Sequence, residues 1–135
     1  MNPEYRKVRF QTETTPKDLP DDFFIITSCN PMDQKLSETE NRKRNLFLQN
    51  KILHAGYICF SIIGTSPDFT HQEPSFITNA PKDLAFLWAK EFNQRAIFRV
   101  SKDELTILGC QNKDESIALG SFKSRLHQGM KSIEG

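Results

Sequence analysis

The segment that most constrains the fold is residues 23–31, which read Phe-Phe-Ile-Ile-Thr-Ser-Cys-Asn-Pro. Its apolar first half predicts a buried strand. Asn30-Pro31 ends that strand, because proline cannot continue a sheet ladder and restricts the residue before it. The polar side chains of Thr27, Ser28 and Asn30 are then held at the carboxyl tip of a strand, where open α/β folds usually place their ligand sites. The segment locates a candidate site but does not specify a chemistry.

Composition limits the class of protein. The chain has 135 residues, 37% of them hydrophobic and 26% charged, with a formal net charge of +1. These values favour a single globular domain without a basic field for nucleic acid. Its apolar runs are too short to cross a membrane, and its first ten residues lack the apolar core of a secretory signal. Three cysteines within apolar runs are typical of reduced thiols, so we expect a cytoplasmic protein with no membrane association.

The order of predicted elements gives a fold class. Ser37 and Glu40 form a capping-box pattern that opens a long helix ending near Gly56. Strands are expected at 23–29, 57–64, 74–78, 95–100 and 105–110, with a second helix at 81–92. This order predicts a single-domain α/β (α+β) protein, a split β-α-β (ferredoxin-like) two-layer sandwich with an extra hairpin strand. A three-layer sandwich is the main alternative. The expected organisation is an N-terminal arm and loop at 1–22, the α/β domain at 23–112, and a tail at 113–135.

The long helix carries a second clue to the site. Its expected inner stripe comprises Asn41, Asn45, Leu48, Ile52 and Ala55. The lower part of the stripe is apolar and should face the sheet, whereas the upper turns present two amides near the Thr27–Asn30 tip. Buried amides need partners, so they either tie down the loop at 30–36 or bind a ligand there, and we favour the first interpretation. The basic residues at 42–44 either form a solvated face of the helix or, if the amides line a ligand pocket, attract an anion to it.

Four motifs resemble those of a known family. They are Ile26-Thr27-Ser28-Cys29-Asn30-Pro31, Glu40-Asn41-Arg42-Lys43-Arg44, Glu73-Pro74-Ser75-Phe76 and Phe92-Asn93-Gln94-Arg95-Ala96-Ile97. Together they resemble, in the same order, the bacterial domain of unknown function 3293 family (DUF3293). The chain departs from the family forms at His71, Asn93 and Arg95, where the family favours Trp, Gly and Asn. The family implies no activity that could be transferred, so the resemblance maps a site only.

The resemblance supplies the candidate site residues. The positions that match the motifs are Thr27, Asn30, Pro31, Asn41, Arg44, Glu73, Ser75, Gln94 and Ala96. From these we select Thr27, Asn30, Asn41, Arg44, Glu73, Ser75 and Gln94 as candidate ligand-binding residues. Because these motifs leave one strand tip, open the following helix and enter a neighbouring strand, we expect them to converge in space.

Glu73 and Gln94 each allow two interpretations. Glu73 with His71 could act as a base and its orienting group, but pairing of Glu73 with Arg44 or Arg95 to lock the loop is the better explanation. Gln94 is either a C-terminal cap or a group that reads an amide edge. We see no third metal ligand at a recognised spacing and no catalytic or nucleotide-binding motif, so we expect neither metal nor cofactor, and enzymatic activity is uncertain, leaning to none.

Two classes of function remain open. In the first, the protein binds a small polar or anionic, nucleotide-like ligand in a pocket at the strand tips. In the second, it is a non-catalytic protein-interaction or regulatory module, of phage–host type for example, whose motif residues are architectural. Unpaired polar groups in a pocket would favour the first class, whereas a satisfied internal network with an exposed apolar patch would favour the second.

Overall fold

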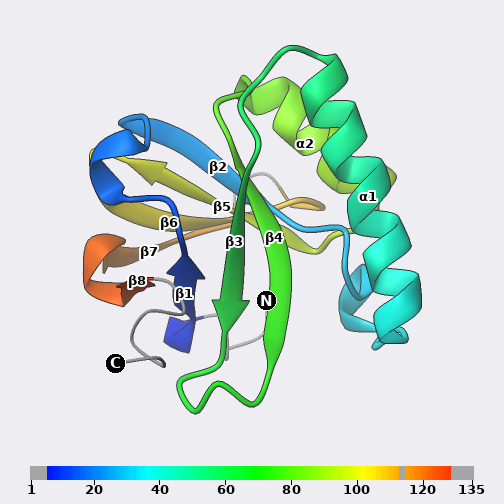
Figure 1. Ribbon diagram of the computed structural model, residues 1–135, viewed down its shortest axis with the longest axis horizontal. Coiled ribbons are helices and arrows are strands. Elements are labelled where there is room, and N and C mark those ends of the chain that lie inside the picture. Colours follow the sequence, from blue (N-terminus) through cyan, green and yellow to red (C-terminus); the bar gives the residue numbers. More distant parts are fainter. Residues whose placement is uncertain (1–5, 113–114, 129–135) are drawn as a thin grey trace.

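The computed structural model describes residues 6–112 and 115–128, which form one curled sheet with two helices. Figure 1 shows both helices on the same side of the sheet. The elements are β1 (Arg9–Thr12), β2 (Asp22–Ile26), α1 (Glu38–His54), β3 (Phe60–Thr65), β4 (Gln72–Thr78), α2 (Lys82–Glu91), β5 (Ala96–Ser101), β6 (Glu104–Gly109), β7 (Ser116–Ser121) and β8 (Leu126–Gln128).

The eight strands follow the order β7-β6-β5-β2-β4-β3-β1-β8. Neighbouring strands are antiparallel, except for the parallel pair β1 and β8. The two strand–helix–strand units interleave, because β4 lies between β2 and β3, and β2 lies between β4 and β5. This interleaving brings the ends of β2, β4 and α1 together, which positions the candidate site.

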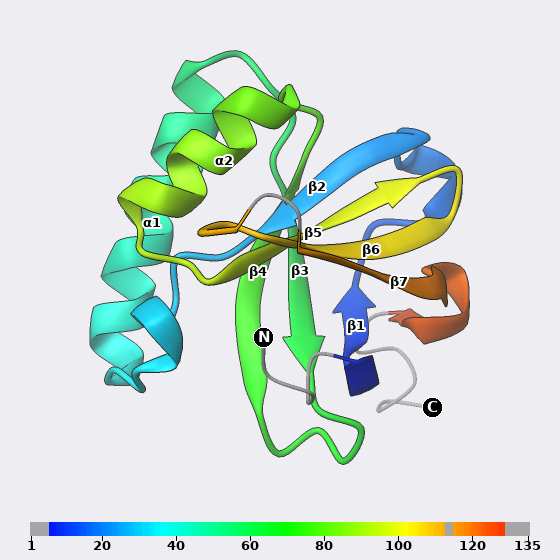
Figure 2. The same ribbon diagram turned by 180° about the vertical axis from the view of Figure 1, so that it is seen from behind.

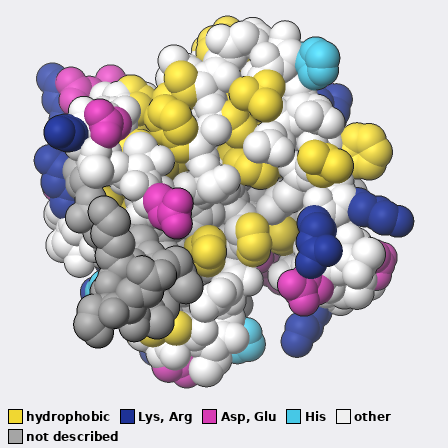
Figure 3. All heavy atoms as spheres, viewed as in Figure 1, with side chains coloured by type: hydrophobic (Ala, Val, Ile, Leu, Met, Phe, Trp, Pro, Cys, Tyr) yellow, Lys and Arg dark blue, Asp and Glu magenta, His cyan; other side chains and the backbone are white. Residues whose placement is uncertain are grey.

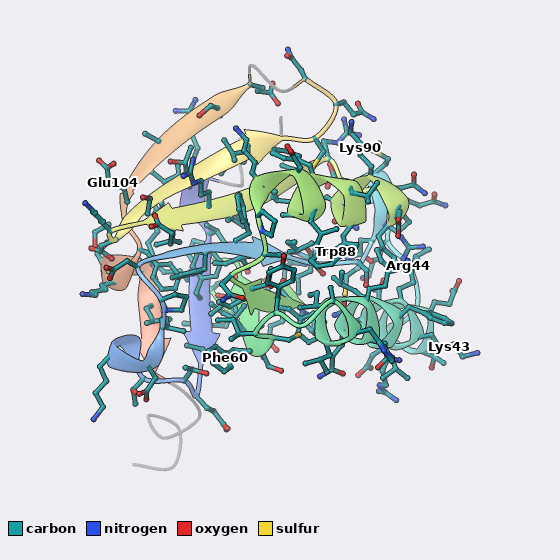
Figure 4. The ribbon with its side chains drawn as sticks, turned by 90° about the horizontal axis from the view of Figure 1, so that it is seen from above. Lys43, Arg44, Phe60, Trp88, Lys90 and Glu104 are labelled. Carbon is teal, nitrogen blue, oxygen red and sulfur yellow. The ribbon has the colours of Figure 1, made fainter. Side chains whose placement is uncertain are left out.

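Both faces of the sheet are buried, each by a different partner. On one face, Ile26, Phe76 and Ile97 pack in a core with the helix residues Ile52 and Trp88. Figure 4 shows the two helices side by side over this face, with Trp88 between them.

The other face is covered by the sheet itself. The rings of Phe10 on β1 and Phe98 on β5 have centroids 5.3 Å apart, although three strands separate β1 from β5 in the sheet. Phe122, just after β7, also contacts Phe10. Such contacts require a strongly curled sheet, and Figure 2 shows β1 and β7, which lie near opposite ends of the strand order, close to each other.

Helix α1 forms as the sequence predicts. Ser37 accepts a hydrogen bond from the Glu40 N–H, and the Glu40 side chain returns to the Ser37 N–H, which completes the capping box. Leu48 and Ile52 are fully buried against the sheet. Gly56 follows with φ of 87°, a left-handed conformation that glycine adopts without strain. Only Ala55 departs from the predicted inner stripe, because it is exposed.

The structure confirms a mixed α and β protein, but it does not confirm a ferredoxin-like two-layer sandwich with one extra hairpin strand. Strands β6, β7, β1 and β8 extend the central four, and the sheet curls so that a second, smaller part of the core lies between strands. Within the described residues, no helix is long and apolar enough to span a membrane.

The ends of the chain need a correction. Residues 116–121 and 126–128, which were expected to belong to a tail, are strands β7 and β8 of the sheet, and Phe122 between them is buried. Within the stretch expected to form an arm and loop, Arg9–Thr12 is strand β1, which lies between β3 and β8. The expectations for residues 1–5, 113–114 and 129–135 lie outside the described residues.

Candidate functional site

The candidate site is a network of polar side chains at the end of β2, the first turns of α1 and the start of β4. Asn45 is buried, and its Oδ1 accepts hydrogen bonds from the Ser28 N–H at 3.0 Å and the Ser28 hydroxyl at 2.5 Å. Its Nδ2 donates to the Pro74 carbonyl at 2.8 Å. Thr27 donates to the same carbonyl, also at 2.8 Å. These bonds tie α1 to β2 and β4 below the site.

Asn30 and Asn41 form a reciprocal amide pair above this layer. The Asn30 N–H donates to Asn41 Oδ1 at 2.9 Å, and Asn41 Nδ2 donates to Asn30 Oδ1 at 2.8 Å. The same Asn30 oxygen accepts from the Leu36 N–H at 3.0 Å. The two amides therefore hold the loop that precedes α1. This is the role that the preferred interpretation gave to Asn41, whereas Asn45 binds Ser28 and Pro74 instead of the loop.

Arg44 and Gln94 connect this loop to the end of α2. Arg44 Nε donates to the Ser28 carbonyl at 2.6 Å, and its Nη2 donates to the Phe92 carbonyl at 2.5 Å. Buried Gln94 donates from Nε2 to the carbonyls of Cys29 and Phe92 at 3.0 and 3.1 Å. Figure 4 shows Arg44 where the two helices meet, whereas Lys43 points away from the protein.

Glu73 is the chemically unusual group of the network. Among the described residues, its carboxylate accepts only a long hydrogen bond, 3.4 Å, from Asn30 Nδ2. The expected pairing with Arg44 or Arg95 is wrong: Arg44 binds main-chain carbonyls, and Arg95 forms an ion pair with Asp33 at 2.8 Å. Burial raises the pKa of Glu73 to about 7; the bond from Asn30 acts in the opposite direction, and the negative charge of Asp33 raises the pKa further.

The loop beside Glu73 is strained. Asn30, Met32 and Asp33 have positive φ angles of 46°, 50° and 63°, and Asn93 opposite them has 55°. Asn and Asp tolerate this region, but methionine rarely adopts it, and each such residue costs about 1–3 kcal/mol. The Met32 N–H donates to the Asn93 carbonyl at 2.8 Å, which locks the two segments together. Asn93 stands where the family favours glycine, in keeping with this backbone conformation.

The structure brings most of the predicted residues together. Six of them lie in two adjoining sets of hydrogen bonds. Asn30 bonds Asn41 and Glu73, and the second set joins Thr27, Arg44 and Gln94 through the main chain of Ser28, Cys29 and Phe92. Ser75 does not reach the others through its side chain, because its buried hydroxyl donates to the Glu73 carbonyl within the same strand. Ser28, Asn45 and Asp33 also belong to this network, although they were not among the selected candidate residues. The spacing of four residues between Asn41 and Asn45 was the signal for Asn45, but nothing in the sequence singled out Asp33.

Metal and thiol chemistry have little support in this network. Across the described residues, no group of three or more His, Cys, Asp or Glu side chains is placed to hold a metal ion. Cys29 is buried, and burial raises the pKa of its thiol. His71 is exposed on the loop before β4 and is not hydrogen-bonded to Glu73. Most polar groups of the candidate site are already hydrogen-bonded to one another or to the main chain.

The comparisons with known proteins agree with the motif map. Residues 26–97, more than half of the chain, match the family described as Protein of unknown function (DUF3293). The chain belongs to this family. No curated protein and no solved structure matches it. The match begins at the end of β2 and ends in β5, so the DUF3293 region contains both helices and the whole polar network.

The pKa of Glu73 predicts a pH-dependent stability. In the folded protein the Glu73 carboxyl has a pKa of about 7, whereas in the unfolded chain its pKa is near 4.5. The folded protein therefore binds the carboxyl proton more tightly than the unfolded chain does. The contribution of this protonation to the free energy of unfolding is therefore complete below pH 4.5 and is lost as the pH rises through about 7. We expect Glu73→Gln, which stays neutral, to gain about 2 kcal/mol of unfolding free energy relative to the wild type between pH 5 and pH 8. Urea unfolding at both pH values measures this, and a difference that does not change with pH would contradict it.

Proposed function

We propose that this protein is a non-catalytic interaction module that binds an acidic, partly apolar segment of a partner protein on the outer face of α1. That face comprises Lys43, Leu46, Phe47, Asn50, Leu53 and His54, all exposed and all on the side of the helix opposite Leu48 and Ile52. The observation that carries the proposal is the exposure of three large apolar side chains there: Leu46 is 57%, Phe47 64% and Leu53 52% exposed.

Such exposure on one helix face is the usual mark of a binding surface. Figure 3 shows hydrophobic and basic side chains together on the side of the molecule where α1 lies. These apolar residues do not serve the core, since α1 buries a separate stripe against the sheet. The helix is thus apolar on two opposite faces, and one of them has no partner within the described residues.

Charge supports an acidic partner. The sequence has no Asp or Glu between Glu40 and Asp68, whereas Arg42, Lys43, Arg44 and Lys51 fall in this interval. Arg42 and Lys51 form ion pairs with Glu38 and Glu91 at 3.4 and 2.9 Å. Lys43 forms no ion pair with any described residue, and it lies one helical turn before Phe47 on the same face of α1. A segment that combines carboxylates with apolar side chains complements this surface.

The test is site-specific photo-cross-linking in the cells that produce the protein. We expect p-benzoylphenylalanine in place of Phe47 to cross-link to one partner protein, at a segment rich in Asp and Glu. Adding Lys43→Glu should reduce the yield at least about threefold, because it places like charges together. The control carries the cross-linker at Ala118, an exposed residue of β7. Equal yields from both positions, cross-links only to a second copy, or no effect of Lys43→Glu would contradict the proposal.

A second candidate function is binding of a small polar ligand beside Glu73. One observation favours it: within residues 6–112 and 115–128, the Glu73 carboxylate has a single long hydrogen bond, and it lies beside the strained loop at 30–33. An anionic, nucleotide-like ligand is less well supported, because Arg44 directs two of its N–H groups at main-chain carbonyls. Native mass spectrometry tests this candidate, since a retained small molecule that Glu73→Gln abolishes would support it.

The cellular location belongs to the proposal as well. We propose a cytoplasmic protein, a location supported by three free thiols, of which those of Cys29 and Cys110 are buried.

A further inference from the structure

A cavity of about 400 Å³ lies far from the motif network, at the seam where the two ends of the curled sheet approach each other. Its walls come from the turn before β1, from β1 and β7, and from the 3-10 turn at Lys123–Arg125 that follows β7. Four of the residues that line it are cations: Arg6, Lys7, Arg9 and Arg125. Pro67 and Leu119 supply apolar walls. A volume of this size is within the usual range of small-molecule sites.

Arg125 is held in place before any ligand arrives. Its Nη1 donates to the carbonyls of Arg6 and Val8 at 2.8 and 3.1 Å, and its Nη2 donates to the Leu119 carbonyl at 3.1 Å. These acceptors are neutral, so the guanidinium is fixed in position but its charge is not cancelled. A pre-positioned guanidinium loses less entropy when it binds an anion.

The described residues that line this cavity bring positive charges together and contribute no carboxylate. None of the described residues that line it is acidic. The side chains of Arg6, Arg9 and Arg125 form no ion pair with any residue in 6–112 or 115–128. Burial lowers the pKa of Arg125, and the nearby charge of Arg9 lowers it further. Cations that repel each other in this way are relieved by a bound anion.

We propose that this seam cavity binds a small molecule bearing two or more phosphate groups. Guanidinium groups bind phosphate oxygens through paired, charge-assisted hydrogen bonds, and several cations around one cavity suit several negative charges. The chain as a whole has a net charge of only +1, which does not favour a long nucleic-acid backbone as the occupant. The site is independent of the outer face of α1.

The experiment is isothermal titration of the full chain with pyrophosphate at low ionic strength. The test variant is Arg9→Gln, chosen because the Arg9 side chain, unlike that of Arg125, forms no hydrogen bond with the part of the chain that the structure describes. The matched control is Arg99→Gln, which removes the same charge from an exposed position of β5. Circular dichroism melting of both variants confirms that each remains folded.

We expect the wild type to bind pyrophosphate, Arg9→Gln to weaken the affinity by about tenfold or more, and Arg99→Gln to change it less than about twofold. No binding by the wild type at millimolar pyrophosphate would overturn the proposal, as would equal losses in the two variants. A single-stranded oligonucleotide that binds more tightly than pyrophosphate and depends on Arg9 would also overturn it, because the occupant would then be a nucleic acid.

Discussion

Asn45→Ala should reduce the free energy of unfolding by about 2–5 kcal/mol. The substitution leaves the N–H and the hydroxyl of fully buried Ser28 without their acceptor, and each buried unsatisfied group costs about 1–3 kcal/mol. The carbonyl of Pro74 suffers less, because Thr27 still donates to it. Urea unfolding measures the effect.

The control for this substitution lies one helical turn and a half further along α1. Asn50 is an exposed amide of the same helix, so Asn50→Ala should change the free energy of unfolding by less than about 0.5 kcal/mol. A loss below about 1 kcal/mol for Asn45→Ala would show that the amide network does not hold the fold.

Ile52→Ala is the second substitution with a large expected effect. Ile52 is fully buried between α1 and the sheet, so removing three carbon atoms leaves a cavity and should cost about 2–5 kcal/mol. Its neighbour Leu53 is 52% exposed on the outer face, and Leu53→Ala should cost less than about 1 kcal/mol. Comparable losses from both substitutions would mean that the register of α1 is wrong and that the outer face is not free for a partner.

The features that the sequence predicted are those that depend on local spacing. The capping box of Ser37 and Glu40, the buried pair Leu48 and Ile52, and the amides at Asn41 and Asn45 all follow from the helical repeat within one segment. The convergence of the motifs followed from a short loop between a strand and a helix. Each of these inferences needs only a few residues that are close in the chain.

The features that the sequence did not predict depend on contacts between distant segments. Strand β7 reads Ser-Ile-Ala-Leu-Gly-Ser, a weak alternation that becomes a strand because it pairs with β6. The sequence predicted the wrong partners for Glu73 and Arg95, because several side chains of similar length could pair with each. The conformation of the folded loop places Asn30 beside Glu73 and Asp33 beside Arg95. The positive φ of Met32 has no residue signature, since the surrounding hydrogen bonds impose it.

Amide hydrogen exchange of the wild-type protein tests most directly whether the motif residues hold the fold together. The N–H groups of Ser28 and Asn30 lie beyond the end of β2 and donate to the side chains of Asn45 and Asn41, at 3.0 and 2.9 Å. If this network is a permanent part of the fold, both amides should exchange at least about a hundredfold more slowly than an unprotected amide. Exchange close to the unprotected rate at Ser28 and Asn30 would contradict the account, because the network would then be open in solution and its polar groups free for a ligand.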